Sequence, residues 1–233
     1  MTKNPYLKIG VLGGMGPEAS VAFYNRIIKL FQKEQGAQYN FEYPEMLIHN
    51  IPSPDNVEAG VEDELAGYLL SSVQLLESAG MQILAIPCNS AHVHIDKLTE
   101  VAQGKVMNIV AETAKAVHQS GIQKVLLLAT KSTLKYEIYQ PYLKCLGIEV
   151  IVPSTDHQEL ITRSIMRVCD GSINSLTRSA MANLVEAYPG AQGVVLGCTE
   201  IPLIIGQGNL QIPCFDTAEI LARATYEYCL NKG

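Results

Sequence analysis

The chain lacks several patterns that define common classes of protein. None of its 233 residues falls in an uninterrupted apolar run of about 18 residues, which is the length that spans a bilayer. Lysine and arginine do not cluster, and the formal net charge is −6, so we do not expect a surface that binds nucleic acid. The first residues are polar and lack the apolar stretch of a secretory signal, so we expect none. We therefore expect a soluble, cytoplasmic protein with no membrane partner.

Cysteine spacing argues against two common uses of this residue. There is no Cys-x-x-Cys pair, and His92 and His94, close to Cys88, have no second pair of clustered ligands, so we expect no metal site. The sparse spacing also argues against a disulfide framework. Free cysteine is among the most buried residue types, so we expect ordinary packing for Cys145, Cys169, Cys214 and Cys229.

Glycines follow the first apolar run but do not form a nucleotide-binding motif. Residues 13–17 read GGMGP, which lacks the GxGxxG spacing that fits a pyrophosphate, so we expect no nicotinamide or flavin cofactor. We interpret these glycines as a tight turn that brings backbone amides close to a cleft. Residues 130–133 (TKST) follow the matching apolar run later in the chain, as a partner loop or as a helix cap.

Short runs rich in β-branched residues and leucine alternate with longer amphipathic stretches along the whole chain. This alternation predicts an α/β fold, in which helices cover both faces of parallel sheets. The predicted strands cover residues 8–12, 46–51, 82–86, 106–109, 124–129, 149–152, 193–196 and 212–215. The predicted helices cover residues 17–33, 61–78, 111–120, 136–146, 157–169, 175–187 and 217–230.

The sequence also reads as two related halves. The run at residues 8–12 is matched by the run at 124–129, and a Cys88 segment is matched by a Cys198 segment at a similar offset. We predict a first half of residues 1–109, completed by residues 213–233, and a second half of residues 110–212. Ligands bind at the carboxyl ends of parallel strands, so both cysteines would line one cleft between the halves.

Each of the two cysteine segments passes from an apolar run into a small polar turn. Cys88 is followed by Asn89 and Ser90, and Cys198 is followed by Thr199 and Glu200. We expect both turns to lead into helices, whose unpaired N–H groups stabilise a thiolate and could hold a substrate carboxylate. Two thiols that face each other across a pocket could remove a proton from one face of a carbon and return one to the other.

Three segments resemble the signatures of the aspartate/glutamate racemase family: residues 12–19 (LGGMGPEA), 87–92 (PCNSAH) and 197–202 (GCTEIP). The resemblance covers nearly the whole chain and implies racemisation of an amino acid without pyridoxal phosphate or another cofactor. It also implies two pseudo-symmetric α/β domains, a site in the cleft between them, and a homodimer.

The same resemblance assigns roles to individual residues. Cys88 and Cys198 would be the two acid/base residues. The residues that would line the amino-acid site are Met15, Asn89, Ser90, Thr130, Thr133 and Thr199. His92 and Glu200 could tune the two thiols, and a capping or packing role is an alternative for each.

The sequence departs from the family pattern where the substrate side chain would bind. Aspartate-specific members are expected to carry an Arg after an Ile-Pro-Asp phrase and a Lys before a glycine, and here Asn56 and Asp170 stand at those places. A dianionic substrate would lose its charged partners. We therefore hypothesise a substrate with a neutral or cationic side chain, with Asn56 and Asp170 at the distal end of the pocket. Alternatively, Asp170 is a solvated residue at a helix end.

Two other functions are compatible with the sequence. One is a related isomerase, such as a hydantoin racemase or a maleate-type isomerase, in which one cysteine acts as a nucleophile. The other is a non-catalytic amino-acid-binding protein that has kept the fold.

Overall fold

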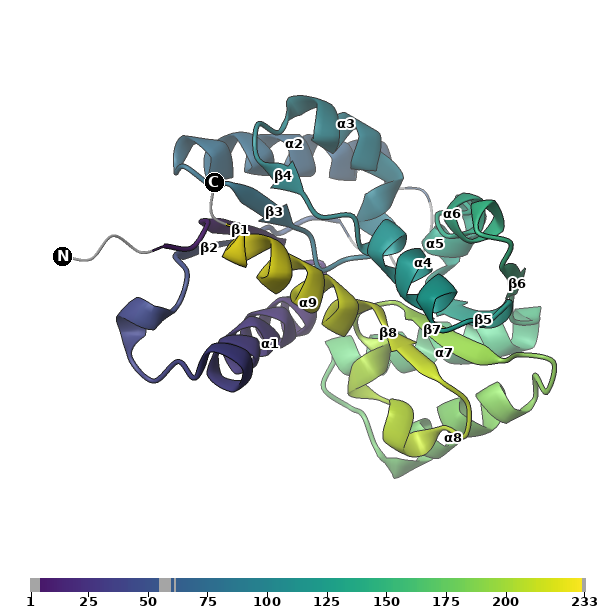
Figure 1. Ribbon diagram of the computed structural model, residues 1–233. Helices are drawn as coiled ribbons and strands as arrows, with labels where there is room; N and C mark the ends of the chain where they lie inside the picture. The colour runs from purple at the N-terminus through teal and green to yellow at the C-terminus, as the bar shows by residue number, and fades with distance from the viewer. Residues whose placement is uncertain (1–4, 55–59, 61, 232–233) are drawn as a thin grey trace.

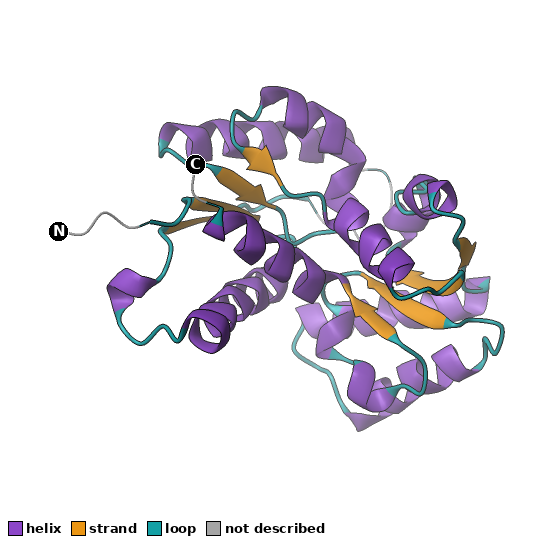
Figure 2. Cartoon of the chain, in the orientation of Figure 1, coloured by secondary structure: helices purple, strands orange, loops and turns teal. Residues whose placement is uncertain are grey.

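The chain forms two parallel sheets of four strands each, flanked by helices (Figures 1 and 2). The computed structural model describes residues 5–54, 60 and 62–231. The first sheet has the order β2-β1-β3-β4 and the second the order β6-β5-β7-β8. The strands are β1 (Ile9–Gly13), β2 (Met46–Asn50), β3 (Ile83–Ala85), β4 (Lys105–Val106), β5 (Lys124–Ala129), β6 (Glu149–Ile151), β7 (Gly193–Gly197) and β8 (Cys214–Asp216). The predicted α/β fold with two halves is confirmed.

Helices connect the strands, as parallel pairing requires. The α-helices are α1 (Pro17–Gln35), α2 (Glu62–Ser78), α3 (Ile95–Val101), α4 (Ile109–Gln119), α5 (Lys131–Lys135), α6 (Gln140–Cys145), α7 (Thr155–Cys169), α8 (Ser175–Glu186) and α9 (Thr217–Leu230). Four 3₁₀ helices are η1 (Asn40–Glu42), η2 (Ser90–His94), η3 (Ile201–Leu203) and η4 (Gln207–Asn209). Within the described ranges, no helix combines the length and the apolar character needed to cross a bilayer.

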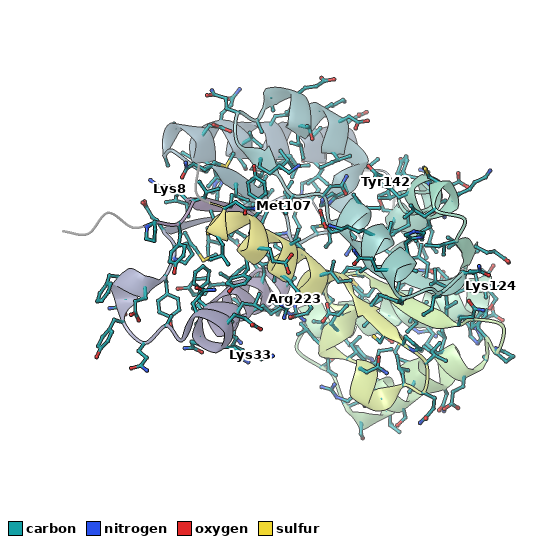
Figure 3. The ribbon with its side chains drawn as sticks, viewed as in Figure 1. Lys8, Lys33, Met107, Lys124, Tyr142 and Arg223 are labelled. Atoms are coloured by element: carbon teal, nitrogen blue, oxygen red, sulfur yellow. The ribbon has the colours of Figure 1, made fainter. Side chains whose placement is uncertain are left out.

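The repeat seen in the sequence is a repeat of structure. Lys8, just before β1, pairs with Glu45 (Nζ to Oε1, 2.9 Å), and Lys124, at the start of β5, pairs with Glu149 (2.6 Å). The two lysines lie on opposite sides of the molecule (Figure 3). They mark the amino ends of equivalent strands, so the carboxyl ends of β1 and β5 point away from these surfaces.

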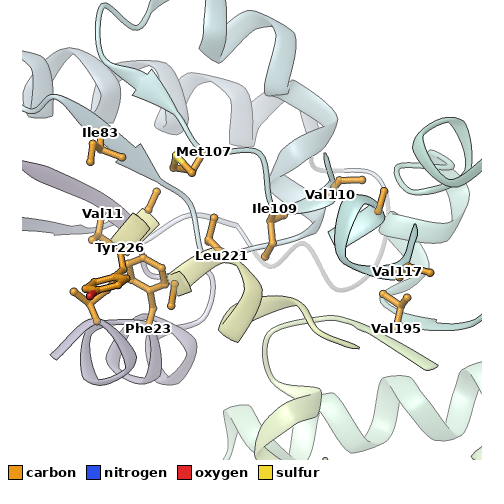
Figure 4. Close-up of a cluster of buried hydrophobic side chains, with 14 of the residues drawn as sticks. Val11, Phe23, Ile83, Met107, Ile109, Val110, Val117, Val195, Leu221 and Tyr226 are labelled. Atoms are coloured by element: carbon orange, nitrogen blue, oxygen red, sulfur yellow. The ribbon is translucent and has the colours of Figure 1, made fainter. Parts of the chain in front are cut away.

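Two helices cross from one half to the other. α4 follows β4 of the first sheet but packs against β8 and α6, whereas α9 follows β8 of the second sheet but packs against α1 and β3. The two helices also pack against each other between the sheets (Figure 1). One buried core therefore contains Val11 and Ile83 from the first sheet, Val195 from the second and Leu221 from α9 (Figure 4).

The structure differs from the sequence prediction at several places. The strand predicted over 106–109 is shorter, since β4 ends at Val106 and Ile109 begins α4. β8 pairs with β7, so Cys214–Asp216 belong to the second sheet, although we expected residues 213–233 to complete the first half. The helix predicted over 136–146 is shorter in the structure: α6 begins at Gln140, and the residues before it form a turn in which Glu137 has φ 48°. Pro141 lies in the first turn of α6, where its missing N–H is tolerated, and it would have broken a longer helix. The short helix α3 was not predicted.

Candidate active site

The carboxyl ends of the central strands of both sheets meet at one cavity of about 220 Å³. Its described lining comes from the segments that follow β1, β3, β5 and β7, as expected for ligand sites in parallel sheets. The loop after β2 and the end of α7 complete it. The described lining residues are Gly14, Met15, Gly16, Ser53, Pro54, Cys88, Asn89, Ser90, Thr130, Cys169, Cys198, Thr199 and Glu200.

Both candidate catalytic thiols lie on the wall of this cavity. Cys88 follows β3 and Cys198 follows β7, and the two residues are 4% and 5% exposed. The expected helices after the cysteines are short 3₁₀ helices, η2 and η3, rather than α-helices. The stabilisation of a thiolate by a long helix dipole is therefore not available at either position.

Glu200 connects Cys198 to the opposite half of the molecule. The thiol of Cys198 donates to Oε2 of Glu200 (2.9 Å), and the backbone N–H of Gly16, at the start of α1, donates to Oε1 (3.0 Å). Burial raises the pKa of the Cys198 thiol well above its ordinary value, and the Glu200 carboxylate raises it further. Cys198 is therefore held as a thiol in the substrate-free site.

His92 supports the backbone of Cys88 rather than its thiol. Its Nε2 accepts the N–H of Ile109 (3.2 Å), so the hydrogen lies on Nδ1, which donates to the carbonyl of Cys88 (2.8 Å). Burial lowers the pKa of His92 to about 4, so the ring is neutral. His92 does not line the cavity; it ties the Cys88 turn to the start of α4.

Three hydroxyl groups form a buried cluster across the cleft. Oγ of Ser90 lies 2.9 Å from Oγ1 of Thr130 and 3.2 Å from Oγ1 of Thr133, and the two threonine hydroxyls are hydrogen-bonded at 3.0 Å. Thr130 also accepts the N–H of Thr133 as the N-cap of α5. Thr130 is thus both a wall of the cavity and a helix cap. Thr133 is fully buried behind that wall and does not line the cavity.

Asn89 and Thr199 occupy equivalent positions after the two cysteines and also join the halves. Nδ2 of Asn89 donates to Thr217 (3.2 Å), and its Oδ1 accepts the hydroxyl of Tyr139. Burial raises the pKa of Tyr139, so this hydroxyl keeps its hydrogen. Thr199 donates to the carbonyl of Pro87 (3.2 Å). Tyr139 was not found from the sequence, because it lies in an irregular turn without a motif.

The glycine turn after β1 approaches the cavity closely, as predicted. Gly14 has φ 98°, and a Cβ there would lie 2.4 Å from the carbonyl oxygen of Ile51, so no other residue fits. Met15, 8% exposed, and Gly16 also line the cavity. The N–H groups of Gly14 and Gly16 donate to Oγ of Ser20 and Oε1 of Glu200 (3.0 Å each), so these two amides hold the turn and the Glu200 carboxylate in place.

Asp170 lies where our alternative interpretation put it, at an exposed helix end, rather than at the distal end of the pocket. Asp170 is exposed, ends α7 and accepts the N–H of Ser172 (2.9 Å), because a carboxylate at a helix end bonds the following turn. Asp170 does not line the cavity, whereas its neighbour Cys169, for which we expected ordinary packing, is exposed and does. Asn56 lies outside the described residues. Arg167, near the end of α7, does not supply a cation to the cavity: it donates to Thr177 on α8 (2.8 Å) and does not line the wall.

The described wall combines polar and apolar groups and carries no positively charged side chain. Along its described part, Glu200 is the charged side chain and neither lysine nor arginine contributes. In the described ranges, no three side chains of His, Cys, Asp or Glu gather in a way that could hold a metal ion.

Comparisons with known proteins all point to one family of racemases. The family model for Asp/Glu/Hydantoin racemase matches residues 12–225. The chain is 29% identical over 220 residues to the broad specificity amino-acid racemase RacX of Bacillus subtilis (strain 168), which covers 93% of this chain and 96% of RacX.

Solved structures agree over nearly the whole chain. An aspartate racemase from Picrophilus torridus superposes with a TM-score of 0.83 at 27% identity and covers 96% of this chain and 94% of its own. An aspartate racemase homologue from Pyrococcus horikoshii OT3 superposes with a TM-score of 0.78 at 30% identity and covers 95% and 98%. The chain therefore belongs to the Asp/Glu/Hydantoin racemase family, and it is an isomerase.

Proposed function

We propose that the protein is an amino-acid racemase in which Cys88 and Cys198 exchange protons with the two faces of Cα. The observation that carries this proposal is that two buried thiols, from equivalent strand ends of the two halves, line one small cavity. One cysteine, as thiolate, takes the α-hydrogen as a proton while the C–H electrons stay on carbon. The other thiol then gives its proton to the opposite face of that carbon.

The remaining lining suits the carbanion that forms in between. Negative charge moves from Cα into the substrate carboxylate, which needs hydrogen-bond donors already in place. Ser90, Thr130 and Thr199, which carry hydroxyl groups, lie on the wall, together with Met15 of the turn after β1. Pyridoxal phosphate is bound through a lysine Schiff base, and no lysine lies on the described wall, which supports racemisation without this cofactor.

We propose that the substrate has a neutral or cationic side chain. A side-chain carboxylate would find no lysine or arginine on the described wall and would meet the carboxylate of Glu200. Ser53, Pro54 and Cys169 border the cavity outside the central strand ends and are uncharged. The broad specificity named for the Bacillus subtilis relative agrees with a pocket of this kind. Asn56 stays a predicted contact.

A panel of L- and D-amino acids in D₂O tests the reaction and the substrate class together. We expect inversion, measured by chiral chromatography, with one solvent deuterium at Cα in each product. Fast turnover of aspartate, with none of the neutral or cationic amino acids, would refute the proposed substrate class. A trappable adduct on one cysteine would instead favour a maleate-type isomerase, and no exchange with any amino acid would favour a binding protein.

We also propose a homodimer in the cytoplasm. Large apolar side chains are exposed around the groove between α1, η1 and β2, including Tyr39 (62%), Phe41 (68%) and Ile48 (44%), which supports a contact with a second copy. All six cysteines are free thiols, which suits a reducing compartment. Light scattering should give twice the 25.4 kDa mass of one chain, and a monomer at all concentrations would refute the dimer.

A further inference from the structure

The two cysteines have the same position in their halves but different neighbours. The residue two positions after each cysteine reaches across the cleft to the turn that follows the first strand of the other half. In the first half this residue is Ser90, which contacts Thr130 of the second half. In the second half it is Glu200, which accepts the N–H of Gly16 of the first half. The repeat therefore places a hydroxyl two positions after Cys88 and a carboxylate two positions after Cys198, and this carboxylate contacts the Cys198 thiol.

The carboxylate constrains the protonation state of Cys198. The thiol and Oε2 of Glu200 are 2.9 Å apart, and the two residues are 5% and 4% exposed. A thiolate beside an ionised carboxylate at this distance and burial is disfavoured by both charge repulsion and desolvation. The pair therefore carries at least one proton, on the sulfur or on the carboxylate.

Among the described residues, the other titratable groups around the pair do not relieve this repulsion. Cys88 raises the pKa of Cys198, and Cys198 in turn raises the pKa of Tyr139. On α1, Oε2 of Glu18 lies 3.7 Å from the place where a Cβ of Gly16 would be. All of these groups are neutral or negative.

We propose that Glu200 is the proton partner of Cys198 and that it makes the two half-reactions unequal. This inference rests on the proposed racemase function. In the substrate-free enzyme Cys198 keeps its proton and serves as the acid, while Cys88 is the base. When Cys198 acts as the base, its S–H bond breaks, an O–H bond forms at Oε2 of Glu200, and the electron pair stays on the sulfur. Before this direction can run, Cys88 takes up one proton from water. The Cys198 sulfur then takes the α-proton, the Cys88 thiol protonates the opposite face, and Glu200 returns one proton to water, which restores the starting protonation state.

Alkylation of the two thiols by iodoacetamide, followed by peptide mass spectrometry over a pH series, tests this without a substrate. Cys88 and Cys198 are almost equally buried, so a difference in rate reports the thiolate fraction rather than access. In the wild type at pH 7 we expect Cys88 to react at least about tenfold faster than Cys198, which corresponds to one pKa unit between them. Equal rates, or a faster Cys198, would overturn the proposal.

The variant Glu200→Gln removes the charge and keeps an amide oxygen for the N–H of Gly16. We expect the pH midpoint for alkylation of Cys198 to fall by about one unit, with a rate about tenfold higher below the midpoint. The Cys88 profile should stay within about twofold. Glu18→Gln removes a neighbouring carboxylate that does not contact the thiol, and it should change neither profile.

An unchanged Cys198 profile in folded Glu200→Gln protein would refute the role of Glu200, and a purely structural role would not move this midpoint. If Glu200→Gln protein does not fold, the comparison of the two thiols in the wild type decides. The outcome is separate from that of the proposed function: a protein that exchanges no amino acid would refute the racemase, whereas the alkylation profiles test Glu200 alone.

Discussion

Removing one buried hydroxyl, in Tyr139→Phe, should weaken both the fold and the site. Tyr139 is fully buried, and its hydroxyl donates to Oδ1 of Asn89, which lines the cavity. The variant leaves that oxygen without this donor, on a residue that is only 2% exposed. A lost hydrogen bond that strands a buried polar group costs about 1 to 3 kcal/mol. We expect the free energy of unfolding in urea to fall by about this amount.

A second tyrosine provides a matched control. Tyr142 also bonds an asparagine side chain, because its hydroxyl accepts Nδ2 of Asn108 (3.0 Å), but this pair is only partly buried (Figure 3 labels Tyr142). Water can replace the missing partner, so Tyr142→Phe should cost about 1 kcal/mol or less. The racemisation rate should fall in Tyr139→Phe and stay unchanged in Tyr142→Phe. Equal losses of stability in the two variants, or full activity in Tyr139→Phe, would refute this reasoning.

Three further predictions concern specificity, backbone and pH. Cys169→Arg places a cation on the cavity wall, and we expect kcat/KM for aspartate to rise about 10- to 100-fold, which is the effect of one charged hydrogen bond. The control Cys145→Arg, at an exposed position away from the cavity, should have no effect, and an equal gain there would contradict the prediction. Gly14→Ala should lower the free energy of unfolding by about 1 to 3 kcal/mol or more, because the φ of Gly14 is 98° and the new Cβ would lie 2.4 Å from a carbonyl oxygen. A melting temperature equal to that of the wild type would contradict this prediction. Burial lowers the pKa of His92 to about 4, so the contribution of the neutral ring to stability is present above pH 6.5 and is lost as the pH falls toward 4. Urea titrations should show that the free energy of unfolding falls by about 3 kcal/mol over this window, and this loss should be missing in His92→Gln.

Part of this structure follows from local pattern. The apolar runs that form β1 and β5 are uninterrupted and almost entirely buried, so the sequence predicts strands of parallel sheets at these positions. Both cysteines directly follow such runs, and the carboxyl ends of parallel strands share an edge, so their meeting in one cavity could be predicted. Thr130 both lines the cavity and caps α5, because a helix cap that directly follows a strand lies at the carboxyl edge of the sheet.

Other parts depend on contacts that no local pattern encodes. Tyr139 reaches Asn89 across 50 positions, and Gly16 reaches Glu200 across 184, so neither pair leaves a periodic signal. At the end of α7, Cys169 and Asp170 are adjacent, and only the rotation of the helix decides which of them faces the cavity. The exchange of α4 and α9 between the halves likewise depends on how the two sheets pack.

The most direct test of racemisation by two thiols is the washout of α-deuterium from each pure enantiomer by two single-cysteine variants. Cys88→Ala and Cys198→Ala should both lose racemisation, and each should still exchange the α-hydrogen of one enantiomer, with opposite preference, because each keeps the base on one face of Cα. Racemisation that persists in either variant, or exchange of the same enantiomer by both, would contradict the assignment of Cys88 and Cys198 to opposite faces.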